Sequence, residues 1–583
     1  MVVLRICLTS MVGSIDGWLV CKNIAPGDTL RIVESKRING KPTPIPIMHI
    51  GSPEELVQRL LSSGDVGQPM SVRSFQHGDV AALKAIADQL GVVGVINKHV
   101  NKTQRGIDVG TTILLAAINR AVDPCSKRGW SKWATETSIH KLFALDPARL
   151  TSQHFWNHMD EVSTETLEAI EAELTQRVIQ KFKIKLDLLF FDPTNFHTYI
   201  ASDNERSQLA QRGRNKQKRF DLRQISVALL AARDGLIPLC SQVYRGNIPD
   251  VKAFPDSLSA IRKRLETVVG NAHDITLVYD KGNNSRANQA LVDGSGVHFI
   301  VSLVPSHHPE LLAIPAYEYH HLQDETLKGF RVHRLKKREI WGAERTVLLS
   351  ISEAFRAKQI RGFEQHLNKC LSALEQWKET LAKPRTGPHS AEQASKKIDE
   401  LLNQQHLKDI VTVTYNEVLT GSARLSWHMD EEKRTYLYTE VFGKRMLMTD
   451  RHGWSDAEIL KAYNAESQFE QTFSLLKNPY HLTVRPQYHW TDQKVRVHIS
   501  ICLIALMLSR LLHKIARDKH QYSGGVDTLL DDLGTVRLAL LMRTPARKGA
   551  RPQCTWMLEE RDNAIVDFFK VLVPNKEPFV YTA

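Results

Sequence analysis

The sequence has few cysteines, the residues that cross-link small secreted proteins and bind the metal in zinc-binding modules. Its 583 residues include only seven cysteines, and no two of them form a C-x-x-C pair. This wide spacing argues against both a zinc knuckle and a disulfide framework. The cysteines instead fit a protein that works in a reducing cytoplasm.

The sequence also lacks a long hydrophobic run. Its most apolar stretch, ISICLIALML at 499–508, covers about half of the ~20 residues that a membrane helix needs, so we interpret it as a buried helix. The apolar N-terminal segment is interrupted by Arg5 and Asp16, and no basic region precedes it, which argues against a signal peptide. We therefore expect no membrane partner.

Acidic residues are too few to balance the basic ones. The chain has 77 Lys and Arg against 64 Asp and Glu, a formal charge of +13 with a pI near 9.2. Such an excess suggests a polyanionic partner, and nucleic acid is the commonest one. The alternative is a basic globular enzyme without such a partner, because 42% hydrophobic and 24% charged residues are ordinary for globular proteins.

The first part of the chain changes from a strand pattern to a helical one. Residues 1–50 alternate apolar and polar around Asn39-Gly40, which predicts a β-hairpin. The helical pattern then continues to about residue 180. Within it, 79–100 has a glycine between two apolar-periodic segments, which fits either a helix-turn-helix or two packed amphipathic helices. We take 1–180 as one N-terminal region, a candidate for binding DNA.

The rest of the chain divides into four parts. Residues 181–303 show three strands and then alternating helices and strands, which predicts a mixed sheet with helices on its faces. Residues 304–453 contain further strands around a helical pair, 454–520 return to a helical pattern, and 521–583 are mixed.

Two apolar strands in the second part run into an aspartate. LLFFDPTNF (188–196) turns polar at Asp192, and ITLVYDKGN (275–283) turns polar at Asp280. Divalent cations such as Mg²⁺ take oxygen ligands, and a two-metal site needs about three carboxylates. A third carboxylate is therefore expected elsewhere in the chain.

The helix predicted from Ser455 to Lys477 offers that carboxylate. Within it, Tyr463, Glu470 and Lys477 stand seven residues apart, so they share one stripe of a continuous helix. In the functional interpretation Glu470 binds metal, Lys477 contacts a phosphate and Tyr463 positions DNA. The alternative is the solvent-facing stripe of an amphipathic helix.

Taken together, these motifs resemble those of a DDE transposase from a bacterial insertion sequence. The resemblance is to the branch in which a long, strand-containing insertion separates the second Asp from the Glu. It covers roughly residues 100–515. The matching residues are Asp192-Pro193-Thr194-Asn195, Gly246 and Asn247 followed by Asp250, Asp280-Lys281-Gly282, and the Tyr-x2-Arg-x3-Glu-x6-Lys signature at Tyr463, Glu466, Glu470 and Lys477.

One signature position departs from the family pattern. Glu466 stands where the family has an arginine. A carboxylate cannot make the phosphate contact of a guanidinium, so that contact comes from another residue or is absent.

The resemblance implies an RNase H-like fold, with a mixed sheet flanked by helices, a mainly helical N-terminal region and an insertion domain at 304–453. Asp192, Asp280 and Glu470 would be the catalytic residues and would hold Mg²⁺, for which Mn²⁺ is expected to substitute. The implied reaction is cleavage at the element ends, followed by attack of the freed 3′-hydroxyl on target DNA. The implied partners are double-stranded DNA, as terminal inverted repeats and as target, and a second copy of the chain. The implied location is the bacterial cytoplasm, at the nucleoid.

Two further segments are candidate DNA contacts. RSQLAQRGRNKQKR (206–219) carries basic residues and no acid, which favours contact with phosphates, although a solvated loop is the alternative. RVHRLKKREIW (331–341) places Trp341 at the end of a basic strand, where a ring can stack on an unpaired base; a core tryptophan is the alternative. The basic candidates in the first segment are Arg212, Arg214, Lys216, Lys218 and Arg219.

The sequence leaves two other functions open. One is a catalytically silent DNA-binding regulator derived from a transposase, and the other is an RNase H-like nuclease without strand transfer. Retention of Asp192, Asp280 and Glu470 argues against the regulator, which needs none of them.

Overall fold

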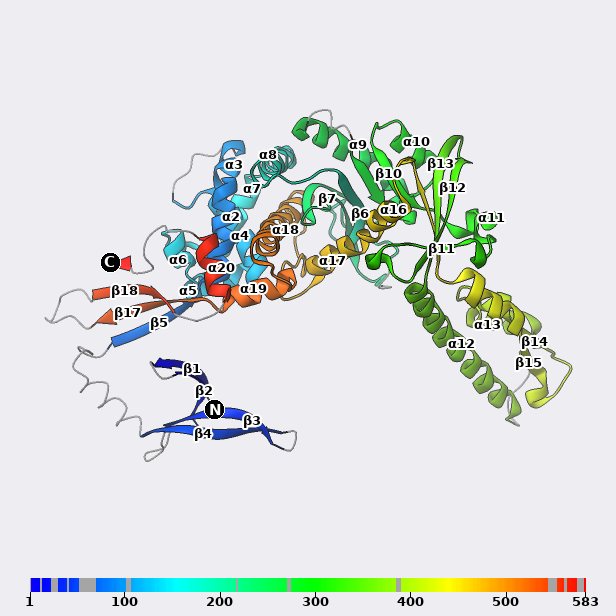
Figure 1. The fold of residues 1–583 in the computed structure, drawn as a ribbon, viewed down its shortest axis with the longest axis horizontal. Helices are drawn as coiled ribbons and strands as arrows, with labels where there is room; N and C mark the ends of the chain where they lie inside the picture. Colours follow the sequence, from blue (N-terminus) through cyan, green and yellow to red (C-terminus); the bar gives the residue numbers. More distant parts are fainter. Residues whose placement is uncertain are drawn as a thin grey trace. The chain divides into compact units, whose positions relative to one another are not determined.

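The chain forms two compact units in the computed structural model (Figure 1). The first contains Met1–Gln76, Val536–Asp562 and Pro574–Ala583, and the second contains His77–Thr535 and Asn563–Val573. The structure describes residues 2–10, 13–21, 30–38, 41–51, 70–100, 106–215, 219–269, 274–383, 389–543, 553–559, 564–573 and 581–582.

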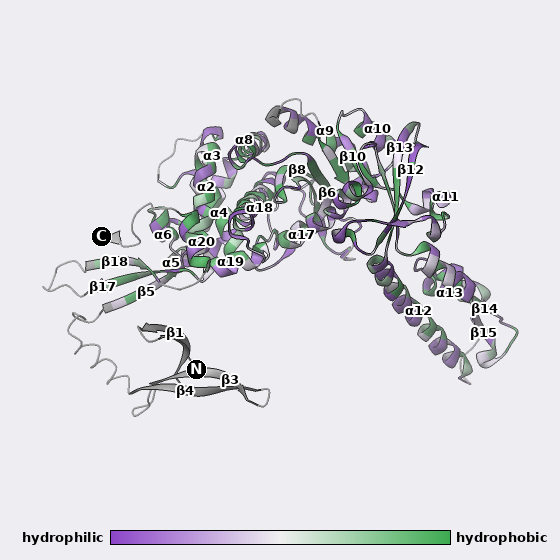
Figure 2. Cartoon of the chain, in the orientation of Figure 1, coloured by the Kyte–Doolittle hydropathy of each residue, from purple (hydrophilic) through white to green (hydrophobic). Residues whose placement is uncertain are grey.

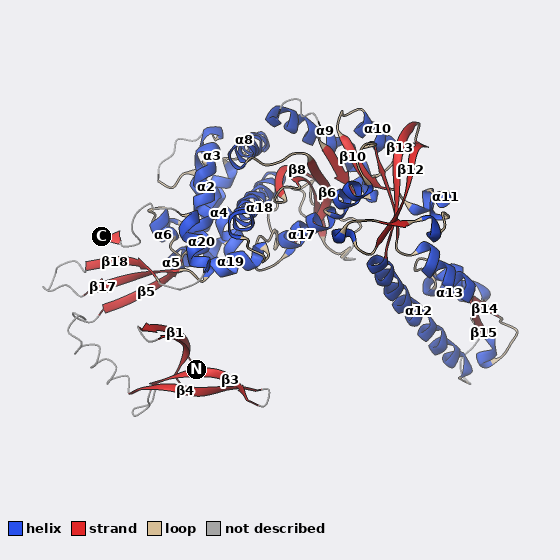
Figure 3. Cartoon of the chain, viewed as in Figure 1, coloured by secondary structure: helices blue, strands red, loops and turns tan. Residues whose placement is uncertain are grey.

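The first unit contains two antiparallel sheets (Figure 3). One has its strands in sequence order: β1 (Val2–Ser10), β2 (Gly13–Cys21), β3 (Leu30–Ile38) and β4 (Lys41–Gly51). Pairing of Ile38 with Lys41 confirms the predicted hairpin, while Asn39-Gly40 itself lies outside the described residues. The other sheet joins both ends of the chain, in the order β19 (Tyr581–Thr582), β18 (Gln553–Leu558), β17 (Arg537–Arg543) and β5 (Met70–Gln76).

A bundle of helices forms one part of the second unit, around α18 (Asp492–His520). This helix is long and apolar enough to cross a membrane, but 89% of its most apolar window is buried inside the protein, as predicted for 499–508. It contacts α2 (Gly78–Leu90), α4 (Val109–Val122), α7 (Ser152–Asp160), α8 (Thr164–Phe182) and α19 (Val526–Gly534). Smaller helices complete the bundle: α3 (Val92–His99), α5 (Trp130–Glu136), α6 (Ile139–Leu142) and α20 (Ala564–Leu572).

The helix pair predicted at 79–100 is a packing unit. Gly91 joins α2 to α3 with a φ of 67°, a left-handed conformation that glycine adopts without strain. Most of α2 is buried between α18, α4 and α19, and α3 packs on α4 and α8. Both helices therefore contribute to the core of the bundle, α3 through Val92, Val95 and Ile96.

A nine-stranded mixed sheet forms the other part of the second unit. Its order is β11-β12-β13-β16-β10-β9-β6-β7-β8. The first three strands in sequence are antiparallel, and β9 and β10 run parallel to β6, which confirms the strand and helix order predicted for 181–303 and the mixed sheet of the fold class. The elements are β6 (Leu188–Thr198), β7 (Arg223–Ala232), β8 (Ile237–Arg245), α9 (Asp250–Val269), β9 (Thr276–Tyr279), α10 (Arg286–Asp293) and β10 (His298–Ser302).

The strands of the predicted insertion extend this same sheet. β16 (Lys444–Thr449) pairs antiparallel with both β10 and β13 (Ala343–Ser352), and β12 (Phe330–Ile340) and β11 (His320–His321) follow. Within 304–453, it is the segment between β13 and β16 that leaves the sheet and packs a hydrophobic core of its own. Its helices carry both hydrophobic and hydrophilic colour (Figure 2). The segment contains α12 (Glu353–Ala382), α13 (Ala391–Leu401), α14 (Leu407–Ile410), β14 (Val411–Tyr415), β15 (Leu425–Met429) and α15 (Glu431–Tyr436).

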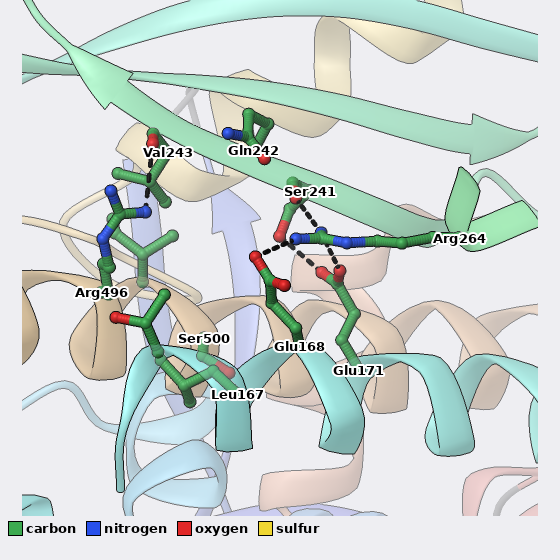
Figure 4. Close-up of a pocket in the computed structure, with 11 residues that line it drawn as sticks. Leu167, Glu168, Glu171, Ser241, Gln242, Val243, Arg264, Arg496 and Ser500 are labelled. Carbon is green, nitrogen blue, oxygen red and sulfur yellow. Dashed lines mark hydrogen bonds and ion pairs between the residues drawn. The ribbon is translucent and has the colours of Figure 1, made fainter. Parts of the chain in front are cut away.

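A partly buried cluster of polar residues joins the bundle to the edge of the sheet. Arg264 on α9 forms ion pairs of 2.7 Å with both Glu168 and Glu171 of α8, and it donates to the carbonyl of Ser241 on β8 (Figure 4). Arg496 of α18 donates to the carbonyl of Val243 at 3.1 Å. Since each arginine is already bonded to protein groups, we assign this cluster a structural role.

A tight turn after β8 depends on Gly246. A Cβ at this position would lie 1.9 Å from the carbonyl oxygen of Gln224, whose side-chain amide also donates to the Gly246 carbonyl at 2.7 Å. Backbone atoms cannot yield as a flexible side chain can. The turn therefore needs glycine, and it leads directly into α9.

Gly246→Ala should lower the free energy of unfolding by about 2–4 kcal/mol. Urea unfolding followed by circular dichroism measures this change. Gly94→Ala is the matched control, because a Cβ on Gly94 in α3 meets nothing within 4 Å and alanine favours a helix. Equal stability of the two variants would show that the turn relaxes freely.

Candidate active site

The two strand aspartates lie side by side. β6 and β9 run parallel with Phe191 opposite Tyr279, so the next residues, Asp192 and Asp280, leave this pairing together. Neighbouring strands are about 4.8 Å apart, which brings the two side chains into reach of one ion. The sequence suggested that this strand ends at Asp192, but β6 extends beyond that residue. It continues to Thr198, paired with β7 alone, because β9 stops at Tyr279.

Helix α17 (Glu466–Lys477) brings a third acid to this point. It packs on β6, where the rings of Phe469 and Phe190 stack with their centroids 5.7 Å apart. At the end of the helix, the Lys477 ammonium donates to the hydroxyl of Thr194 at 2.6 Å. Glu470 lies between these two anchors and lines a cavity that Asp280 also lines.

The predicted single helix is two helices. α16 (Asp456–Asn464) begins at a capping box formed by Ser455 and Glu458, and α17 begins only after Ala465. Glu470 and Lys477 thus share a helix, whereas Tyr463 belongs to the preceding one. Heptad spacing cannot reveal this break, because neither Pro nor Gly marks it in the sequence.

The cavity holds about 220 Å³ and combines both signs of charge. Its acidic side chains come from the residue that follows β9 and from α17, and its basic ones from the turn after β9 and from β16. Ser302 at the end of β10 and Tyr463 at the end of α16 add hydroxyl groups. The charged lining residues are Asp280, Glu466, Glu470, Lys281, Lys444 and Arg445.

Glu466, which stands where the family has an arginine, is a fourth carboxylate of this cluster. The sequence motifs did not predict this role. The Glu466 side chain is 9% exposed. Burial raises the pKa of Glu466 to about 8, with help from the negative charges of Asp280, Asp192 and Glu470, against a hydrogen bond from Tyr463. One signal was present in the sequence: Glu466 precedes Glu470 by four residues, which places both on one helix face.

The two neighbouring cations of β16 have different roles. Lys444 is buried and donates to the carbonyls of Leu312 and Ile314, and burial lowers its pKa. Arg445 is half-buried, with its guanidinium 4.5 Å from the ring centroid of Phe355 and 5.8 Å from that of Tyr463. It forms no ion pair with a carboxylate among the residues that the structure describes. Arg445 is therefore a cation available to a phosphate in this cavity.

The oxygen-rich cluster fits a divalent cation. Within the described part of the chain, no three histidine, cysteine or carboxylate side chains converge as a formed metal-ligand set. However, Asp192, Asp280 and Glu470 all raise the pKa of Glu466, and a bound cation would relieve that repulsion. Carboxylate oxygens are the ligands that Mg²⁺ and Mn²⁺ accept.

Other residues named from the sequence lie around this cluster. The turn that contains Gly246 and Asn247 leads to Asp250, whose carboxylate accepts from the Tyr244 hydroxyl at 2.9 Å. Burial raises the pKa of Tyr244 most, and the negative charges of Asp250 and Asp192 raise it further.

The predicted DNA contacts are distributed over two places. Arg212, Arg214 and Arg219 are exposed in the loop between β6 and β7, while Lys216 and Lys218 lie outside the described residues. Arg219 forms an ion pair of 2.7 Å with Asp221, which offsets its charge. Trp341 occupies the β12–β13 turn with a φ of 54°, has its ring centroid 6.2 Å from that of His308, and does not line the carboxylate cavity.

Residues 184–508 match the family model described as a transposase DDE domain. The match covers more than half of the chain, so the protein belongs to this family, and the resemblance inferred from the motifs is confirmed. Enzymes of this family generally cut and join DNA strands and use divalent metal ions.

Comparison with solved structures adds a structural similarity. The chain is similar to a solved structure titled a cryo-EM structure of the piggyBac transposase synaptic complex with hairpin DNA. The identity is 9%, the coverage 86% of each chain, and the TM-score 0.35. No curated protein matches the chain.

Proposed function

We propose that the protein is a DNA transposase that binds the terminal inverted repeats of its element, cleaves the phosphodiester bonds at the ends and joins the 3′-hydroxyl ends to target DNA. The observation that supports this most is the parallel register that sets Asp192 beside Asp280, next to the helix that carries Glu470. Because two ends must be held together, we also propose that the chain acts as a homodimer. The cytoplasm, at the nucleoid, is the proposed location.

Asp192, Asp280, Glu470 and Glu466 would hold the metal, with Mg²⁺ the proposed ion and Mn²⁺ a substitute. When bound, the metal neutralises charge on the phosphate oxygens and lowers the pKa of the attacking hydroxyl or water. The four side chains supply only oxygen atoms, as these hard ions require. Without metal, Glu466 carries a proton near neutral pH, which limits repulsion within the cluster.

The cations of the site are proposed to hold the DNA backbone. Lys477 already reaches Thr194, two residues from Asp192, so its ammonium lies beside β6 just beyond the carboxylates. Lys281 follows Asp280 directly and lines the cavity. Arg445 offers a planar donor group that can bind two phosphate oxygens at once. We assign to Arg445 the phosphate contact that the signature arginine makes elsewhere in the family.

A cleavage assay tests the proposed function. The purified protein is incubated with DNA that carries the two flanks of its own gene, with Mg²⁺ or with EDTA, and products are mapped to single nucleotides. We expect cuts at a repeat boundary that leave a 3′-hydroxyl and appear only with metal. Cleavage without joining would identify a nuclease, and binding without cleavage across several divalent metals would identify a regulator.

Arg445→Ala should reduce cleavage about 10–100-fold, because one charge-assisted contact to a phosphate is lost. Arg445→Lys should recover part of the rate, since it keeps the charge without the planar fork. Single-turnover cleavage of the same DNA measures both. Arg361→Ala, an exposed position on α12 outside the cavity, is the control. An unchanged rate in Arg445→Ala would remove this residue from phosphate binding.

A further inference from the structure

Exposed aromatic rings gather beyond the carboxylate cluster. Tyr199, directly after β6, is 44% exposed, while Tyr488 and Trp490, in the segment before α18, are 60% and 47% exposed. Large rings are rarely left in water without a partner when they stand together. With Trp156 of α7, these three rings form what we call the aromatic surface.

Hydrogen bonds and ring contacts join the members of this surface. The N–H of Tyr199 donates to the carbonyl of Gln487 at 2.9 Å, and the rings of Tyr199 and Tyr488 have centroids 5.5 Å apart. Trp490 stacks on Trp156 at 6.1 Å with an interplanar angle of 28°. Three separate chain segments are thus held as one ordered surface.

An alternating burial pattern presents two of the rings to solvent. In the extended segment before α18, Gln487 and His489 are buried, whereas Tyr488 and Trp490 are exposed. Residues two apart in an extended chain are separated by about 6.6 Å. This is about twice the 3.4 Å rise between stacked bases, so each ring can meet a different base.

The rings are bordered by lysine and arginine side chains. Lys494 and Lys127 place their ammonium groups 5.1 Å and 5.9 Å from the ring centroid of Trp156. Lys494 pairs with Asp160 at 2.9 Å, and burial lowers the pKa of Lys127 to about 7, so these two lysines add little net charge. Asp492 accepts from the Ser207 hydroxyl at 2.7 Å. The β6–β7 loop that follows Tyr199 adds the exposed arginines described above.

The surface begins a few residues beyond the carboxylate cluster along the chain. Tyr199 stands seven residues after Asp192 along the extended β6 and its continuation, a distance of about 23 Å at most. That length corresponds to about seven stacked nucleotides. Lys477, bonded to Thr194, lies between the two places.

We propose that the aromatic surface binds unpaired bases of the DNA strand within about seven nucleotides of the cleavage point, by stacking on Tyr488 and Trp490. The inference rests on the proposed function, because it takes the carboxylate cluster as the place of cleavage. Rings bordered by basic side chains are how proteins bind single-stranded nucleic acid. A protein partner or a second copy would bring apolar groups, and the basic border complements phosphates instead.

Binding to forked DNA tests this proposal. The full-length protein in EDTA is titrated, by fluorescence anisotropy, against a duplex that carries an unpaired thymidine arm and against the same duplex fully paired. We expect the forked DNA to bind about tenfold more tightly or better. The double variant Tyr488→Ala and Trp490→Ala should bind both DNAs equally, because stacking on the two rings provides the preference.

Two further variants separate stacking from folding. Tyr488→Phe combined with Trp490→Phe keeps both rings and should keep most of the preference. Tyr317→Ala removes an aromatic side chain that is 84% exposed elsewhere in the same unit, and it should bind as the unchanged protein does.

Three results would overturn the proposal: equal binding of both DNAs by the unchanged protein, a preference that survives in the double alanine variant, or a change of oligomeric state in that variant on sedimentation. The last would assign the surface to a second copy of the chain. Cleavage of the element ends with Mg²⁺ is measured on the same preparation. Cleavage without a fork preference refutes the aromatic surface alone, and a ring-dependent preference without cleavage refutes the transposase function alone.

Discussion

Asp192→Asn should abolish metal-dependent DNA cleavage, with a loss of about a thousandfold or more. The substitution keeps the size of the side chain but removes the negative charge at the point where β6 and β9 part. A neutral amide binds a divalent cation far less well than a carboxylate does. Asp280 and Glu470 cannot take the place of Asp192, because each is held by a different structural element and would approach the metal from its own direction.

The matched control is Asp187→Asn, just before the same strand begins. Asp187 lies at the end of β6 away from the carboxylate cluster, where it forms an ion pair with Arg233. The Asp187 side chain is half exposed. This variant should cleave at the normal rate. Cleavage products are measured on gel with Mg²⁺ and with Mn²⁺, and thermal unfolding checks that both variants fold. Undiminished cleavage by folded Asp192→Asn would refute the metal-carboxylate mechanism.

Glu466→Gln should make the metal-free protein more stable than the unchanged one at pH 8 and above. The pKa of Glu466 is about 8 in the folded chain, against an ordinary value of 4.5. Between these values the folded state keeps a proton that the unfolded state releases, so stability falls as the pH rises from about 4.5 through 8. Glutamine carries no such charge, and the difference should reach about 3–5 kcal/mol at most.

Urea unfolding at pH 6, 7, 8 and 9 in EDTA measures this difference. Added Mg²⁺ should narrow it, because a cation offsets the charges of Asp280, Asp192 and Glu470 that act on Glu466. Glu379→Gln, at an exposed position on α12, shows the effect of removing one negative charge from the net charge alone. Parallel pH curves for the unchanged protein and Glu466→Gln would place Glu466 outside the cluster.

Local patterns were enough to predict several parts of the fold. The hairpin around residues 39 and 40, the buried helix at 499–508 and the order of strands and helices in 181–303 all follow from periodicity over a few residues. The prediction of one continuous helix from Ser455 to Lys477 was wrong, because no proline or glycine in the sequence marks the break at Ala465.

The partners and positions of the basic residues could not be predicted from the sequence alone. A run of arginines and lysines in 206–219 was visible at once, but the pairing of Arg219 with Asp221 was not. Arg445 carries no motif, and it joins the site only because β16 lies beside β10 in the sheet. The aromatic surface likewise needs the contact between Tyr199 and Tyr488, which are far apart in the chain.

The sequence by itself determined the family and predicted the three acids of the motifs and the strands that lead to two of them, because apolar runs and short motifs are properties of neighbouring residues. Only the tertiary structure decided that Asp192 and Asp280 share a register, that Glu466 is buried among them, and that Arg445 faces the same cavity. Those facts depend on strand order and on burial, which are set by packing between segments that lie far apart in the chain. No local pattern encodes such contacts, since the free energy that fixes them comes from surfaces that meet only in the folded protein.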